Sequence, residues 1–135
     1  MERLRQRLEL AATALRQLRE LSDRSVLDKV ERDAAIQRFE YTFEATWKAC
    51  QRYLLLREGI DAGSPKTVIR AARDASLLDD TQTESALRMT DDRNLTVHTY
   101  NEALAAAIAG RLPDHARLLS AWLDALERAV PAAND

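Results

Sequence analysis

The stretch Ile36-Gln37-Arg38-Phe39-Glu40-Tyr41-Thr42-Phe43-Glu44-Ala45-Thr46-Trp47-Lys48 decides the fold. Its large apolar residues recur every three or four positions, which places them on one face of a helix. The full stripe consists of Ile36, Phe39, Phe43, Trp47, Cys50 and Leu54. A stripe about five turns long predicts a helix over roughly residues 30–57 with this face in the hydrophobic core.

The polar side of the same helix carries charges at regular spacing. Glu40, Glu44 and Lys48 follow one another at intervals of four residues, so their side chains are neighbours along the helix surface. They form either a solvated ladder of ion pairs or, together with Arg38, a set of contacts at the mouth of a cleft or to a partner. Both interpretations stay open at this point.

The segment before the long helix is also amphipathic. One face carries the apolar residues Leu4, Leu8, Ala11, Leu15 and Leu18. This spacing predicts a first helix that packs on the core, and the arginines on its opposite face fit a solvated surface better than an RNA-binding one. A break at residues 22–28 separates the two helices.

Glycine, proline and capping residues indicate where the following helices begin and end. Gly59 ends the long helix, because glycine adopts the left-handed conformation that closes a helix C-terminus. Ser64 and Pro65 are suited to the N-cap and first position of a short helix to about residue 75. Asp79 or Asp80 caps the next helix, which is expected to run to about Asp92.

The C-terminal part predicts one more helical region. Thr99 and Glu102 have the spacing of a capping box, so a helix is expected to start at Tyr100. Gly110 and Pro113 then predict a break before a final helix over 113–129. Its expected core residues are Leu118, Leu119, Trp122, Leu123 and Leu126. His115 is expected on the surface, and the end from Pro131 through residues 132–135 is expected to fray.

Length and composition limit the fold class. The chain has 135 residues and a mass of 15.3 kDa, with only three glycines and three prolines. We therefore expect one domain, residues 1–135, that is all-α: an antiparallel four-helix up-and-down bundle with one or two additional short helices. A bundle of this size that also carries a cleft would gain stability from dimerisation.

Charge and cysteine content restrict the function classes. The net charge of −2 gives no attraction of the whole molecule for nucleic acid, so RNA binding would need a local basic patch. A single cysteine, Cys50, excludes an intramolecular disulfide, and no apolar run has the length of a membrane span or a signal peptide. We expect a cytoplasmic protein without a metal site or cofactor, since no Cys/His cluster or Gly-rich phosphate loop occurs.

Functional side chains concentrate in Asp91-Asp92-Arg93-Asn94-Leu95-Thr96-Val97-His98-Thr99-Tyr100-Asn101. Within eight residues, Arg93 offers a fixed cation for phosphate, Asn94 an amide, His98 an imidazole that titrates near neutral pH and Tyr100 a phenol. An isolated histidine here is most often bonded to backbone, and an isolated tyrosine is most often packed. The four together favour a site, with Asp92 as a further candidate cleft or partner contact.

The pattern Arg-Asn-x-x-x-His-x-Tyr resembles the signature of HEPN-domain proteins. With residues 36–48 and the segment from Gly59 to Arg70, it is most similar to the HepT toxins and the related nucleotidyltransferase substrate-binding subunits, over about residues 32–102. The resemblance implies a homodimer with a composite cleft in which Arg93, Asn94 and His98 cleave RNA without metal. It also implies a minimal nucleotidyltransferase partner that adds AMP to Tyr100.

The chemistry of the motif agrees with such an arrangement. Cleavage by the 2′-hydroxyl needs one group to remove a proton, another to donate one, and positive charge at the phosphate. His98 alone does not readily perform both proton transfers. A two-fold dimer that brings two copies of the motif together would supply a second histidine.

Three functions share these residues. The first is a metal-independent ribonuclease toxin of a HEPN/minimal-nucleotidyltransferase pair. The second is a non-catalytic substrate-binding subunit of a two-component nucleotidyltransferase. The third is a dimerisation module in which the motif only cements the interface. The sequence leaves the choice among them open.

Overall fold

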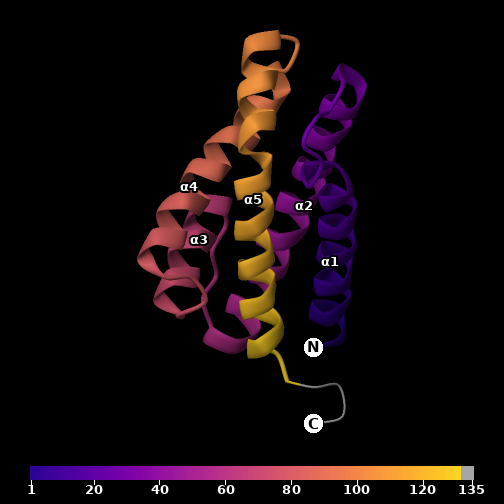
Figure 1. Ribbon diagram of the computed structural model, residues 1–135. Coiled ribbons are helices and arrows are strands. Elements are labelled where there is room, and N and C mark those ends of the chain that lie inside the picture. The colour runs from indigo at the N-terminus through magenta and orange to yellow at the C-terminus, as the bar shows by residue number, and fades with distance from the viewer. Residues whose placement is uncertain (132–135) are drawn as a thin grey trace.

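The computed structural model describes residues 1–131, and every regular element within them is helical (Figure 1). The elements are α1 (Glu2–Ser22), α2 (Lys29–Tyr53), α3 (Pro65–Asp74), α4 (Asp80–Leu95) and α5 (Glu102–Ala129). A π-helical turn, η1 (Leu54–Glu58), extends α2, and a 3-10 turn, η2 (Thr96–His98), extends α4. The predicted all-α bundle is confirmed, whereas the expected fraying of residues 132–135 lies outside the described residues.

Three long helices form the centre of the molecule. α1, α2 and α5 pack against one another, and the antiparallel pair α3 and α4 packs on α2 and α5. The chain runs up α1 and back down α5, so both ends of the described chain lie at the same end of the bundle (Figure 1). Arg5 fastens these ends, because its Nη2 donates to the carbonyl oxygen of Pro131 at 3.0 Å.

The predicted apolar stripe of α2 lies in the core. Ile36, Phe39, Phe43, Cys50 and Leu54 are buried, and the rings of the two phenylalanines lie 6.3 Å apart. Burial raises the pKa of the Cys50 thiol to about 12, so the thiol stays protonated and is no nucleophile at neutral pH.

Trp47 is the one member of the stripe that is not fully buried. It packs at the edge of the core, and its Nε1 donates to Glu44 Oε2 at 3.2 Å. This hydrogen bond satisfies the indole N–H on the polar side of α2, as expected for an aromatic residue at a boundary.

α1 and α5 supply the apolar faces that pack against α2. All five apolar residues predicted for the first helix are buried, as are Leu119, Trp122, Leu123 and Leu126 of α5, while Leu118 is half-buried. Within residues 1–131 no helix is long and apolar enough to cross a membrane.

Most helix ends follow the sequence signals. Asp79, and not Asp80, caps α4 in a capping box with Gln82, and the Ser64 side chain accepts from the amide of Thr67 at the start of α3. Gly59 closes η1 with a φ of 67°, in the left-handed region that favours glycine.

The prediction for the start of α5 is wrong. The N-cap is Asn101, whose side chain accepts from the amide of Leu104 at 3.1 Å, and the helix begins at Glu102. Thr99 does not cap it, because its hydroxyl donates back to the carbonyl of Thr96 at 3.2 Å and so closes the turn of η2. α4 also runs on to Leu95, three residues beyond the expected end.

The predicted break at Gly110 and Pro113 is also wrong, since α5 is continuous through both residues. Pro113 has no N–H, so the carbonyl of Ala109 lacks its helical hydrogen bond. Burial outweighs this loss, because the residues Ile108, Leu112, Ala116 and Leu119 on both sides of the proline are all buried. Interrupting the helix would expose one half of that apolar face, and each such side chain contributes about 1.5–3 kcal/mol by burial.

Two glycine substitutions test this description. Gly110→Ala should raise the free energy of unfolding by about 0.5–1 kcal/mol, because the position is helical and an added Cβ meets no atom within 4 Å. Gly59→Ala should lower it by about 1–2 kcal/mol, because its φ is positive. Urea unfolding of both variants measures the difference, and a destabilised Gly110→Ala would contradict a continuous α5.

Candidate functional site

The predicted motif lies where α4 passes through η2 into α5. We call Arg93, Asn94, His98 and Tyr100 the motif surface. The Thr96 hydroxyl donates to the carbonyl of Arg93 at 2.7 Å, and the amide of Asn101 donates to the carbonyl of His98 at 3.0 Å. These hydrogen bonds hold the backbone of residues 93–101 in a compact turn, so the positions of the motif residues are fixed.

Arg93 faces α2 rather than open solvent. Its guanidinium lies 3.4 Å from Glu44 Oε1 and 4.0 Å from Glu40 Oε2, and only 24% of its side chain is exposed. Nε is buried and has no partner in hydrogen-bond geometry, so the contact with Glu44 is an ion pair. Two carboxylates therefore compensate the charge that would hold a phosphate.

His98 and Tyr100 are exposed and contact each other. His98 Nδ1 and the Tyr100 hydroxyl are 3.2 Å apart, and the two rings meet edge to face with centroids at 5.8 Å. Tyr100 is 81% exposed, which is far more than a packed aromatic would be. Its phenol is open to a reagent while remaining within reach of an imidazole.

The structure brings the predicted residues to one end of the bundle without joining them into one cluster. Among the described residues no hydrogen bond or ion pair links Arg93 to His98, and Asn94 is exposed. Lys48 is exposed next to Glu44, at 3.8 Å. Arg38 lies elsewhere, because it donates to the carbonyl of Gln17 at 2.8 Å and so contacts α1.

The N-terminus of α5 is occupied by an acidic side chain of the protein. Glu102 stands in its first turn and pairs with Lys29 at 2.9 Å and with Arg32 at 3.0 Å. The hydrogen bonds from Lys29 and Arg32 lower the pKa of Glu102. A carboxylate in the first turn of a helix interacts favourably with the positive end of the helix dipole, so Glu102 stabilises the start of α5.

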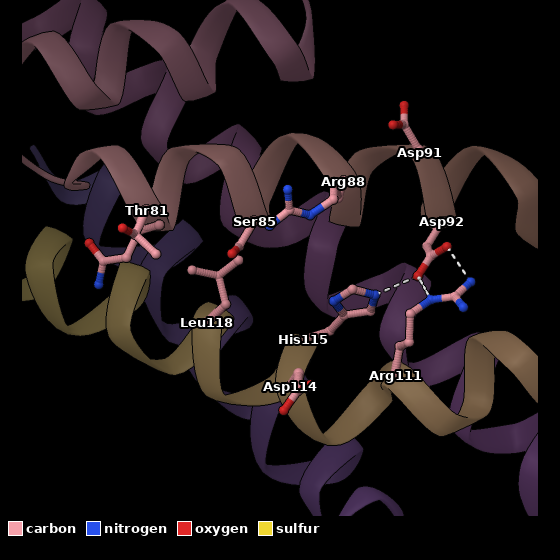
Figure 2. Close-up of a pocket in the computed structure, with 10 residues that line it drawn as sticks. Thr81, Ser85, Arg88, Asp91, Asp92, Arg111, Asp114, His115 and Leu118 are labelled. Carbon is pink, nitrogen blue, oxygen red and sulfur yellow. Dashed lines mark hydrogen bonds and ion pairs between the residues drawn. The ribbon is translucent and has the colours of Figure 1, made fainter.

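A pocket of about 570 Å³ opens between α4 and α5 (Figure 2). We call it the α4–α5 pocket. It is lined by Thr81, Gln82, Ser85, Arg88, Asp91, Asp92, Arg111, Asp114, His115 and Leu118. Only Asp92 among these is a candidate from the sequence, and its side chain points to α5 (Figure 2).

Asp92 is the centre of a polar cluster in which Asp92 and His115 are buried and Arg111 is exposed. Arg111 donates to both of its oxygens at 2.8 Å, and His115 Nε2 lies 2.7 Å from Oδ2. His115 also stacks on Phe39 with ring centroids 5.1 Å apart. The expectation that His115 lies on the surface is therefore wrong: it is 8% exposed and links the core to the pocket.

Burial and hydrogen bonding set the charges in this cluster. Burial acts to raise the pKa of Asp92, but hydrogen bonds from Arg111 and His115 outweigh it and lower that pKa below its usual value. Burial lowers the pKa of His115, although Asp92 opposes this shift. At neutral pH the cluster therefore holds an ionised carboxylate and a neutral imidazole.

A partial signal for this cluster exists in the sequence. Arg111 and His115 are four residues apart, which places them on one face of a helix. The predicted break at Pro113 separated them, and no local pattern indicates that Asp92 lies opposite. Only the packing of α4 on α5 brings the three together.

With this geometry described, comparison with known proteins identifies the family. The family model described as "Nucleotidyltransferase substrate binding protein like" matches residues 4–128. The chain belongs to this family, and the predicted relationship to nucleotidyltransferase substrate-binding subunits is confirmed.

Solved structures agree with the assignment. A protein of Thermus thermophilus is 58% identical, superposes with a TM-score of 0.85, and the match covers 87% of this chain and 99% of that one. The Haemophilus influenzae protein HI0074, described as having the fold of a substrate-binding domain of a nucleotidyltransferase, has a TM-score of 0.73. At 24% identity over 89% of this chain and 98% of that one, it shows likeness of fold. A search of curated proteins gave no significant match.

The lowered pKa of His115 predicts a pH-dependent stability. The unfolded chain binds a proton at this histidine near pH 6.5 whereas the folded chain binds it only at lower pH, so the free energy of unfolding should fall as the pH drops below about 6.5. Urea unfolding at about pH 7.5 and about pH 5.5 should show this loss, and His115→Gln should show less of it. Equal pH dependence in the two proteins would contradict a buried neutral His115.

Proposed function

We propose that this chain is the non-catalytic substrate-binding subunit of a two-component nucleotidyltransferase. The observation that carries the proposal is the family match over residues 4–128. The fold shared with HI0074, described as that of a nucleotidyltransferase substrate-binding domain, supports it. In this role the chain holds the substrate while a separate subunit transfers the nucleotide. We further propose that residues 1–135 form a single domain of a cytoplasmic protein.

The electrostatics of the motif surface favour this role over cleavage of RNA. Glu40 and Glu44 compensate Arg93, and the formal net charge of the chain is −2. A phosphodiester approaching Arg93 would meet these two carboxylates as well. The motif surface therefore lacks the local excess of positive charge on which binding of RNA depends.

The exposed part of the motif surface is the proposed contact for the nucleotidyltransferase. Asn94, His98 and Tyr100 are exposed, as is the neighbouring Val97. Here the partner would transfer AMP to Tyr100: the phenol oxygen forms a bond to the α-phosphorus of ATP, the bond to the β-phosphate breaks, and pyrophosphate leaves. His98 Nδ1, 3.2 Å from the hydroxyl, is placed to take the phenol proton.

The resemblance to HepT toxins and the position of Tyr100 next to His98 together predict one modified residue. Co-expression with a cognate nucleotidyltransferase should give a stable complex and, with ATP and a divalent metal, mass additions of AMP on this chain. Tyr100→Phe should abolish the additions, because Tyr100 is the phenol beside His98. The control is Tyr41→Phe, since Tyr41 is also exposed, at 57%, but lies on α2 and has no hydrogen bond or ring contact with a histidine among the described residues. Adducts that persist in Tyr100→Phe would show that another residue is the acceptor.

A ribonuclease toxin is the second candidate, favoured by the exposure of His98 and Asn94 next to Arg93. It requires a homodimer that unites two motif surfaces, because one imidazole does not readily serve as both acid and base. It also requires Arg93 to leave Glu40 and Glu44 when RNA binds.

If the chain is a ribonuclease, His98→Ala should slow RNA cleavage at least about 100-fold and abolish growth inhibition, through loss of a positioned acid or base. Arg93→Ala should act likewise, whereas Arg70→Ala, at an exposed arginine of α3, should not. Cleavage of labelled RNA by the purified dimer, with chelator present, measures the effect. A parent protein without cleavage or toxicity would leave the substrate-binding function as the better account.

A further inference from the structure

The α4–α5 pocket has the size and form of a small-molecule site. Its volume of about 570 Å³ lies in the range of ligand pockets, roughly 300–1,000 Å³. Successive turns of α4 form one wall through Thr81, Ser85 and Arg88, and α5 forms the other (Figure 2). Both walls are regular helix, so the polar groups are held on rigid elements.

The floor of the pocket presents a hydrogen-bond acceptor. An ionised carboxylate can only accept, so His115 Nε2, 2.7 Å from Asp92 Oδ2, carries the ring hydrogen. Nδ1 then has a free lone pair, and no described residue donates to it. Stacking on Phe39, with 19° between the planes, fixes the ring. Figure 2 shows the second ring nitrogen turned away from Asp92, on the side of Ser85 and Leu118.

The positive charges at the pocket are less compensated than the negative ones. Asp91 pairs with Lys66 at 2.7 Å, and Asp114 pairs with Arg117. Arg88 is exposed and has no hydrogen bond or ion pair within the described part of the chain. It is therefore the charge without a counterion in this pocket.

Arg111 adds further donors at the pocket, on the opposite side of the His115 ring from Arg88 (Figure 2). It uses Nε and one N–H of Nη2 for Asp92, and its remaining N–H groups stand on a side chain that is 47% exposed. Guanidinium groups bind carboxylates and phosphates through paired N–H donors.

We propose that the α4–α5 pocket binds a small molecule that carries an oxyanion, either phosphate or carboxylate, together with a hydroxyl group. Arg88 holds the oxyanion, and the hydroxyl of the ligand donates to Nδ1 of His115. The proposal rests on the substrate-binding function above, for which it supplies the site and the class of substrate.

A substitution of Arg88 tests ligand binding without changing the stability of the fold. Asp92, Arg111 and His115 also fasten α4 to α5, so substitution of any of them changes stability. Arg88→Ala removes a side chain without a structural partner and should leave the fold intact. Arg3→Ala is the matched control, because Arg3 is likewise exposed but lies on α1, which forms no wall of the pocket.

The test uses the isolated chain labelled with nitrogen-15 and two probes, ribose 5-phosphate and gluconate, with ribose as the probe that lacks an oxyanion. The chain has two histidines, so their ring nitrogens are distinguished by NMR with His98→Gln, and His98 serves as an internal reference. We expect one oxyanion probe to shift the Nδ1 resonance of His115 with a Kd of about 1 mM or tighter. Arg88→Ala should weaken this binding at least about 10-fold, and Arg3→Ala should not change it.

The two probes decide between phosphate and carboxylate. The proposal is overturned if neither probe shifts the His115 resonance at about 10 mM, or if Arg88→Ala binds as tightly as the parent. The proposal would also be overturned if ribose shifted the His115 resonance as much as the anionic probes do. This NMR test contains no nucleotidyltransferase. Failure of the chain to bind such a partner would therefore contradict the proposed function but would not change the outcome of the ligand-binding test.

Discussion

Burial of one face of α2 is the constraint on which the rest of the structure depends. Phe39 and Phe43 have no exposed surface, and α1 and α5 are the helices that cover them. Apolar burial of this kind is the main favourable term in folding. It requires α5 to present an unbroken apolar face, which is why the helix continues through Pro113 despite the lost hydrogen bond.

The polar sites follow from that packing. Because α5 is continuous, Arg111 and His115 project from the same side of it, and α4 places Asp92 opposite. The ring of His115 lies on Phe39, so the polar cluster stands directly on the core. A buried carboxylate needs hydrogen-bond partners, and Arg111 and His115 supply them. The cluster links α4 to α5 and also forms the floor of the pocket.

The motif surface and the α4–α5 pocket differ in how their charges are compensated. At the motif surface the cation, Arg93, is compensated by two acidic residues, whereas His98 and Tyr100 are open to solvent. In the α4–α5 pocket a carboxylate is compensated, whereas Arg88 is open. This separation suits a subunit that contacts a protein partner at one place and holds a small molecule at another. A phosphate-cleaving centre would instead need the free cation and the imidazole side by side.

The sequence by itself determined the helical class, the core faces and most helix ends, because these depend on local spacing and on capping residues. The stripe of α2, the capping of α3 and α4 and the left-handed Gly59 are all set within a few residues of the chain. The family was likewise visible in residues 93–100 with the segments around 36–48 and 59–70. Only the tertiary structure decided the continuity of α5, the ion pairs of Arg93 and the burial of His115. Each of these depends on side chains from helices distant in sequence, since a lost backbone bond or a buried charge is tolerated only where packing or a partner from another helix compensates for it.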